Sequence, residues 1–306
     1  MFTTPILLIV FNRPSTTQQT FNVLKQLRPK YLFVAADGPR ANVPEDAERC
    51  RATRTIIETQ IDWECDLQTL FRLENKGCGH GPAEAVTWFF GHVEAGIILE
   101  DDCLPELSFF SFCQQLLKRY ETDERVYMIT GTNALKRWFR SRQSYFFSYM
   151  AHSLGWASWR RAWQAFDYEM KDVDTERVQK RLCATLSNNR YADYYLAQFV
   201  TYQKTRPADV WDFQWLFARW VNGGYTIVPA VNLISNIGFH ADATHSFNEN
   251  DLLAKLPVYP ITFPLKHAKP NIDKLFDWVV FERFVNPKKR SVWKKILLKS
   301  IRLIAT

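Results

Sequence analysis

Short apolar runs alternate with longer stretches of helical periodicity over roughly the first 120 residues. We predict four strands in this part of the chain, over residues 5–11, 31–36, 67–73 and 97–99. A helical pattern follows each strand, as the spacing of Phe21, Leu24 and Leu27 shows for the first one. Repeated strand–helix units predict a mostly parallel sheet with right-handed crossovers, and therefore an α/β fold.

The second half of the chain has fewer strands and more aromatic side chains. We predict strands over residues 126–131, 144–150 and 225–231, and helices that begin within 155–163 and cover 175–185, 190–204 and 211–221. The chain contains no internal repeat and no low-complexity linker. We therefore divide it into two halves of one domain, 1–130 and 131–250, and an extension over 251–306.

Polar residues follow each of the four N-terminal strands. In chain order they are Asn12 and Arg13, then Asp37, then the glycine-rich segment 74–82 with His80, and finally Glu100, Asp101 and Asp102. The carboxyl ends of parallel strands share one edge of a sheet, and ligands bind at that edge in open α/β folds. A nucleotide site built from several strand ends explains all four groups together.

Three consecutive carboxylates, Glu100, Asp101 and Asp102, are the strongest single signal. Pro105 and Glu106 are expected to open the helix that follows, over residues 107–120. Three adjacent acids repel one another unless a cation or hydrogen-bond donors neutralise them. A divalent metal that holds a phosphate meets this need, whereas the alternative is a helix cap in a solvated turn.

The glycine-rich segment 74–82 is expected to be a loop before a helix over 83–92. It lacks the G-K-S/T ending of a Walker A motif, and it is not a G-x-G-x-x-G followed by a ribose-binding acid. These absences in the sequence argue against an ATPase and against a nucleotide-dependent dehydrogenase.

Composition adds two constraints. The net charge of +7 arises from seven basic residues after position 285, because the other 32 of the 39 basic residues balance the 32 acidic residues. A neutral body argues against a nucleic-acid-binding surface. The six cysteines show no metal-ligand spacing and suit reduced thiols of a cytoplasmic protein.

The basic tail predicts an amphipathic helix over residues 292–304. It is too short and too charged to span a bilayer, but it suits the anionic inner surface of a membrane. The alternative is a helix packed on the body with its lysines in solvent. The first apolar run is too short for a signal peptide. We expect a cytoplasmic protein, held peripherally at the inner membrane if the tail binds lipid.

The order of these motifs resembles that of the GT-A fold glycosyltransferases, and most closely the N-acetylglucosaminyltransferase I type. The resemblance extends from about Pro5 to Ser246. The matching segments are residues 8–13, 33–38, the Glu-Asp-Asp form of the D-x-D motif at 100–102, 154–156 and 210–215, with His80 twenty residues before Glu100. The fold implied is a GT-A (Rossmann-like), mostly parallel sheet flanked by helices, with an aromatic-rich acceptor half.

The resemblance also implies roles on the donor side, in the half 1–130. Arg13, Asp37 and His80 would line the nucleobase pocket, while Asp101 would face the ribose. Glu100 would lie near the donor sugar.

Metal and acceptor residues are implied by the same resemblance. Asp102 would bind Mn²⁺ or Mg²⁺ directly, with His245 as a later metal or phosphate contact. Asp212 would be the catalytic base, and Trp156 and Trp211 would lie on the acceptor side. The family has paired acids at the base, whereas Phe213 follows Asp212 here, so the base is either shifted by one position or lies elsewhere.

We therefore predict a metal-dependent inverting glycosyltransferase that moves a sugar from a nucleotide-diphosphate donor, expected to be a UDP-sugar, to a glycan or glycolipid acceptor. One alternative is a sugar-nucleotidyltransferase, which would want glycines in the loop after the first strand, where Asn12, Arg13 and Pro14 stand. The other is a non-catalytic nucleotide-sugar or glycan-binding protein.

Overall fold

The computed structural model describes residues 1–138, 142–186, 188–206, 209–238 and 254–285. An eight-stranded sheet runs through these residues in the order β3-β2-β1-β4-β8-β6-β9-β7. Its strands are β1 (Ile6–Val10), β2 (Tyr31–Ala36), β3 (Asp66–Phe71), β4 (Ala95–Glu100), β6 (Val126–Thr130), β7 (Tyr145–Ser148), β8 (Trp156–Trp159) and β9 (Tyr225–Pro229). Only β8 and β7 run against the other strands of this sheet. Next to it, β5 (Cys103–Pro105) pairs with β10 (Ile234–Asn236).

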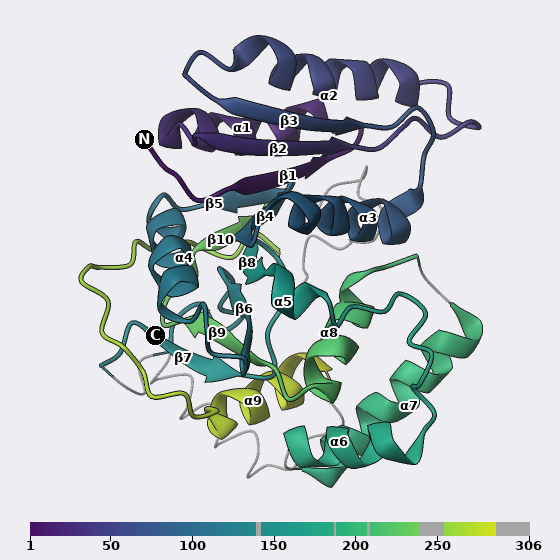
Figure 1. Cartoon of the computed structure of the whole chain (residues 1–306), viewed down its shortest axis with the longest axis vertical. Helices are drawn as coiled ribbons and strands as arrows, with labels where there is room; N and C mark the ends of the chain where they lie inside the picture. Colours follow the sequence, from purple (N-terminus) through teal and green to yellow (C-terminus); the bar gives the residue numbers. More distant parts are fainter. Residues whose placement is uncertain (139–141, 187, 207–208, 239–253, 286–306) are drawn as a thin grey trace.

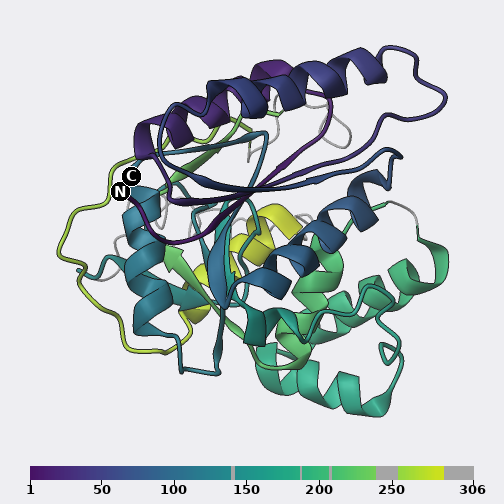
Figure 2. The same ribbon diagram turned by 45° about the horizontal axis from the view of Figure 1, so that its top comes forward.

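Helices cover both faces of the large sheet (Figure 1). In chain order they are α1 (Pro14–Leu27), α2 (Asp46–Gln60), α3 (Gly77–His92), α4 (Ser108–Arg119), α5 (Arg160–Trp163), α6 (Glu176–Leu186), α7 (Asn189–Thr205), α8 (Asp212–Val221) and α9 (Lys274–Val280), which continues into a π-helical turn (Phe281–Val285). Apolar residues of α1, α2 and α4 pack on one face, while those of α3, α5 and α8 pack on the other. Figure 2 shows the two helix layers with the sheet between them.

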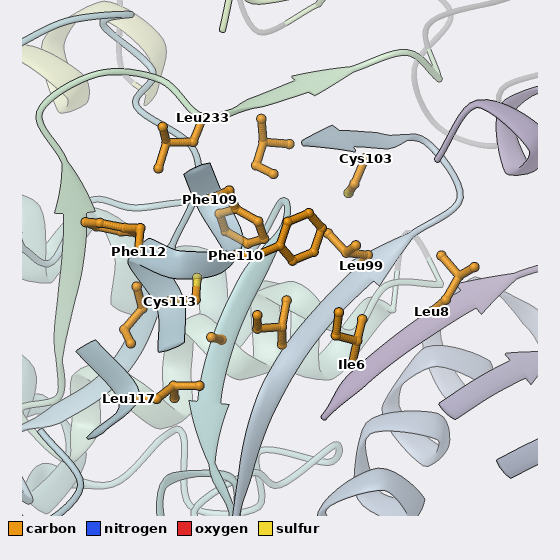
Figure 3. Packing of buried hydrophobic residues seen from close by; sticks show 14 of the residues in the cluster. Ile6, Leu8, Leu99, Cys103, Phe109, Phe110, Phe112, Cys113, Leu117 and Leu233 are labelled. Carbon is orange, nitrogen blue, oxygen red and sulfur yellow. The ribbon is translucent and has the colours of Figure 1, made fainter. Parts of the chain in front are cut away.

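Alternation along the central strands produces the two cores. Leu8 of β1 belongs to the cluster on the α4 side and its neighbour Leu7 to the cluster on the α3 side, since successive strand residues point to opposite faces. Figure 3 shows Phe109, Phe110 and Phe112 of α4 in one cluster with Ile6 and Leu99, with Phe110 next to Leu99, and all five side chains are fully buried. Each such side chain stabilises the fold by about 1.5 to 3 kcal/mol through burial. A third cluster joins α6, α7, α8 and α9 to β7.

The predicted fold class, an α/β fold with a mostly parallel sheet flanked by helices, is confirmed by this architecture. The N-terminal strands lie where the apolar runs predict them, and β2 matches its predicted residues at both ends. The halves 1–130 and 131–250 contribute to one continuous sheet, because β8 of the second half pairs with both β4 and β6 of the first.

Three local predictions are wrong. Residues 156–159 form strand β8, and only four residues of helix α5 follow it, because alternate residues of β8 face the two different cores. Pro105 ends strand β5, and α4 begins three residues later, where the Glu106 carboxylate accepts the Ser108 backbone N–H at 2.8 Å. A two-stranded edge tolerates a proline at this position. The glycine-rich segment is largely helical, because α3 begins at Gly77.

The predicted tail helix and His245 lie outside the described residues. Among the helices within the described ranges, none has both the length and the apolar content needed to cross a membrane.

Candidate active site

A cavity of about 550 Å³ opens at the carboxyl ends of β1, β2 and β4. Its volume lies within the range of small-molecule binding sites. Both halves of the chain line it: the N-terminal half through residues of the strand ends and α3, and the C-terminal half through residues 152–154, 209–212, Asn236 and Gly238. The predicted ligand edge of the sheet is therefore hollow, and the second half closes one side of it.

The acidic trio is held at this edge by the backbone. Glu100 is the last residue of β4, in register with Ile9 of β1. Asp101 and Asp102 form the turn that leads to β5, and all three acids border the cavity. The Thr20 hydroxyl of α1 lies 3.1 Å from both the Asp101 and Cys103 carbonyl oxygens, so the turn is tied to a helix beneath it.

Arg13 neutralises two of these acids. Its Nε lies 3.3 Å from Asp101 Oδ2, its Nη2 binds Asp101 Oδ1, and its Nη1 lies 3.3 Å from Asp102 Oδ2. Burial lowers the pKa of Arg13, but the charges of Asp101 and Asp102 outweigh this and raise it, so the guanidinium stays charged. The cation that the acidic trio was predicted to need is, in part, a side chain of the protein itself.

Asp101 borders the cavity, but its carboxylate is covered by Arg13. Only 2% of its side chain is exposed and both carboxylate oxygens are bound to Arg13. Asp101 therefore holds the Arg13 guanidinium in place, and its contact with a ribose stays a prediction. The Arg13 side chain also borders the cavity, and its contact with a nucleobase stays a prediction.

Asp102 is the acid best placed to bind a metal. Its side chain is 17% exposed, and Gly238 lies so close that an added Cβ would stand 2.5 Å from Asp102 Oδ2. Only a residue without a side chain fits beside this oxygen. The described residues contain no group of three or more His, Cys, Asp or Glu side chains arranged to hold a metal. A divalent cation at this edge would have Asp102 as its one carboxylate ligand, with a bound phosphate and water supplying the remaining oxygens.

Glu100 and Asp212 are electrostatically linked across the cavity. Burial raises the pKa of Glu100, and the negative charges of Asp102, Asp101 and Asp212 raise it further, against the opposing effect of Arg13. Asp212 is an exposed residue at the start of α8 and borders the same cavity. Asp212, the acid predicted as the base, therefore contributes to the raised pKa of Glu100.

Asp37 borders the cavity but its carboxylate is engaged by α3. It accepts the backbone N–H groups of Lys76 and Gly77, at 2.9 and 3.2 Å, and the Asn75 side-chain amide at 3.0 Å. Burial raises the pKa of Asp37, although these donors act in the opposite direction. This carboxylate caps the helix, which limits what remains for a nucleobase.

His80 and Trp156 are not brought into the cavity. His80 is exposed on α3, where its ring stacks on Tyr168 at 3.9 Å between centroids. Trp156 is only 1% exposed, because β8 is a central strand. Trp211 does border the cavity and stacks on Trp156 at 5.7 Å between ring centroids, so it is the one of the two predicted tryptophans that lines the cavity.

A contact between α3 and the segment before α8 was not predicted from the sequence. Asp209 accepts a hydrogen bond from the Tyr168 hydroxyl at 3.0 Å, and the Cys78 thiol lies 2.9 Å from the Asp209 carbonyl oxygen. Gly77 and Gly79 make room for the carboxylate, since an added Cβ would lie 2.2 and 2.1 Å from its oxygens. Burial raises the pKa of Cys78 to about 11, so the thiol stays protonated. Gly77 and Gly79, two glycines separated by one residue, were the sequence feature that could have indicated a close contact at the start of α3.

Comparison with known proteins gives only distant likenesses. No family model and no curated protein matches the chain. Among solved structures, one match is the crystal structure of S. aureus TarS residues 1–349, with a TM-score of 0.43 and 10% sequence identity. The match covers 98% of this chain and 80% of the TarS chain. A second match is the apo form of UDP-glucose pyrophosphorylase, with a TM-score of 0.35 and 9% sequence identity. This match covers 76% of this chain and 93% of the pyrophosphorylase chain. TM-scores of this size assign neither a family nor an activity, and the N-acetylglucosaminyltransferase I type stays a prediction.

Proposed function

We propose that the protein is a metal-dependent, inverting glycosyltransferase that uses a nucleotide-diphosphate sugar, with UDP as the expected nucleotide, and a glycan or glycolipid acceptor. The observation that carries the proposal is the placement of Asp102 and Asp212. These acids come from different halves of the chain and line one cavity of about 550 Å³ at the strand ends.

The donor would occupy the strand-end side of this cavity. Asp102 would hold Mn²⁺ or Mg²⁺, which when bound neutralises the charge of the diphosphate leaving group. Arg13 is a protein cation at this position, because it contacts Asp102. Glu100 borders the same cavity, and the donor sugar would lie near it.

The acceptor would enter from the side of α8. Its hydroxyl gives its proton to the Asp212 carboxylate as the oxygen forms a bond to the anomeric carbon. The bond from that carbon to the diphosphate breaks, and its electron pair stays on the phosphate oxygen. A single displacement of this kind inverts the anomeric centre. Trp211, which is 5% exposed at the cavity wall, offers an apolar face to a sugar ring.

The test is calorimetric titration of UDP, GDP and CDP into the purified protein, first with Mn²⁺ and then with EDTA. We expect tight binding of one nucleotide in Mn²⁺, with loss of affinity in EDTA. Asp102→Asn should lose the Mn²⁺ dependence while its thermal unfolding stays close to that of the wild type. If this variant binds the nucleotide as tightly as the wild type in Mn²⁺ and still loses affinity in EDTA, Asp102 is not the metal ligand.

Two outcomes would replace the proposed activity. Binding of a UDP-sugar without transfer to any acceptor glycan or to water would indicate a nucleotide-sugar-binding protein. Formation of a nucleotide-sugar from a nucleoside triphosphate and a sugar phosphate, with release of pyrophosphate, would indicate a sugar-nucleotidyltransferase.

A further inference from the structure

Arg13 is fixed in position by contacts of both its backbone and its side chain. It is the residue before α1, and Pro14 follows it at the first helical position. Its carbonyl oxygen accepts the Thr17 backbone N–H at 3.0 Å and the Thr16 hydroxyl at 3.1 Å. The guanidinium then contacts Asp101 through two nitrogens and Asp102 through the third. Backbone and side chain thus hold this cation against the acidic turn.

The two contacts differ in strength and in exposure. The two-nitrogen contact with Asp101 has the fork geometry that arginine and carboxylate favour, and the Asp101 side chain is 2% exposed. The contact with Asp102 is a single one at 3.3 Å, and this side chain is 17% exposed. The second contact can therefore be given up while the first persists.

The Asp102 oxygen that contacts Arg13 also lies beside Gly238. Oδ2 lies 3.3 Å from Arg13 Nη1 and 2.5 Å from the position of a Cβ on Gly238, and both Asp102 and Gly238 line the cavity. The other oxygen, Oδ1, lies 3.8 Å from the thiol of Cys103, which is fully buried. A cation that binds Oδ2 must share this oxygen with Arg13 or displace the guanidinium.

We propose that Arg13 is a built-in countercharge that blocks Asp102 to a free divalent cation and yields it only when the cation arrives with a nucleotide diphosphate. This inference rests on the proposed function. A bare cation at Oδ2 would meet the positive guanidinium at close range. A diphosphate brings negative charge between the two, and the released Nη1 gains a phosphate oxygen as its new acceptor.

The arrangement couples metal and nucleotide binding. If the nucleotide raises the affinity for the cation, the cation must raise the affinity for the nucleotide by the same factor. We therefore expect Mn²⁺ alone to bind the wild-type protein at least tenfold more weakly than Mn²⁺ in the presence of saturating UDP. The coupling should be lost when the guanidinium is removed.

The test compares Mn²⁺ binding without nucleotide in the wild type, Arg13→Gln and Arg72→Gln. Binding is measured by calorimetry and by the loss of the electron paramagnetic resonance signal of free Mn²⁺. Arg13→Gln should bind Mn²⁺ alone at least tenfold more tightly, and UDP should then improve Mn²⁺ affinity much less than in the wild type. Arg72 also borders the cavity but contacts Gly81 and Glu84, so its variant should keep the wild-type affinity for Mn²⁺ alone.

Arg13→Gln leaves Asp101 without its partner, so folding needs its own check. Thermal unfolding with and without Mn²⁺ supplies it, since a bound cation should raise the unfolding temperature of this variant more than that of the wild type. Arg13→Lys, which keeps one charge and loses the fork, is the fallback and should show a smaller gain in affinity for Mn²⁺ alone.

The proposal is overturned if folded Arg13 variants bind Mn²⁺ alone no more tightly than the wild type, or if wild-type affinity for Mn²⁺ is the same with and without bound UDP. The proposed function fails separately, when the wild type binds none of the three nucleotides in Mn²⁺. In that case the comparison with Mn²⁺ alone still reports whether Arg13 blocks Asp102.

Discussion

Individual carboxylates in the cavity differ in what their oxygens already bind. Asp37 caps α3 through backbone N–H groups, and Asp101 is covered by the fork of Arg13. Asp102 meets Arg13 through one oxygen, and Asp212 is exposed at the first residue of α8. Asp37 and Asp101 hold parts of the site in place, whereas Asp102 and Asp212 are the acids to which the proposed function gives a chemical role.

We predict that Asp212→Asn binds the nucleotide with an affinity within about twofold of the wild type but transfers sugar at least 100-fold more slowly, because loss of a general base has an effect of roughly this size. Calorimetry and a single-turnover transfer assay measure the two quantities. Asp209→Asn is the matched control, because the Asp209 carboxylate already accepts the Tyr168 hydroxyl, and it should change the transfer rate by less than about tenfold. Near-normal transfer by Asp212→Asn would place the base on another residue.

At the scale of elements, the start of α3 is the contact between the two halves at the cavity. Gly79 is in a helical conformation, where alanine is normally the better residue. An added Cβ would, however, stand 2.1 Å from Asp209 Oδ1 and 2.3 Å from the Tyr168 hydroxyl. Gly91 lies near the other end of the same helix, with nothing within 4 Å of such a Cβ.

Gly79→Ala and Gly91→Ala should therefore change stability in opposite directions. Gly91→Ala should raise the free energy of unfolding by roughly 0.5 to 1 kcal/mol through helix propensity. Gly79→Ala should lower it by about 1 to 3 kcal/mol, because Asp209 and Tyr168 must move. Urea unfolding of both variants beside the wild type measures this. Equal stabilisation by both would mean that Asp209 does not pack against α3.

Elements with one dominant hydrophobic period could be predicted from the sequence, whereas a strand that packs against two cores could not. The buried N-terminal strands and helix α7 lie close to their predicted residues because one pattern dominates each. Strand β8 was not predicted because it is buried on both faces. Trp156 and Trp159 belong to different cores, so the segment lacks the alternation of apolar and polar residues that marks a half-buried strand.

The candidate site divides in the same way. Acids that directly follow a strand, such as Asp102, could be predicted because strand ends share one edge of a sheet. The contact of Asp209 with Cys78 spans 131 positions and depends on how the second half folds back over α3, which no local pattern encodes. The pairing of Arg13 with Asp101 spans 88 positions and was missed for the same reason.

At the scale of the whole molecule, one sheet passes through both halves, so a buried group in one region affects the stability of the entire fold. Asp277 of α9 is such a group. Its carboxylate accepts the Ser148 hydroxyl at 2.5 Å and the Tyr149 backbone N–H at 3.3 Å, and so joins α9 to the end of β7. Burial raises the pKa of Asp277 to about 7, against the effect of these donors.

A raised pKa in the folded state means that the folded protein keeps this proton to a higher pH than the unfolded chain does. The contribution of Asp277 to stability is therefore fully present below about pH 4, where an unfolded aspartate is protonated, and is lost as the pH rises to about 7. A difference of about three pKa units corresponds to about 4 kcal/mol at most.

Asp277→Asn should lose this pH dependence. Relative to the wild type, its free energy of unfolding should rise between pH 4 and pH 7 by up to about 4 kcal/mol, because the asparagine never ionises. Urea unfolding at several pH values measures the difference, and since every other titratable group is common to both proteins, the difference isolates Asp277. Parallel pH profiles would show that the carboxylate is ionised at no cost, with the Ser148 hydroxyl and the two backbone N–H groups at the end of β7 fully replacing water.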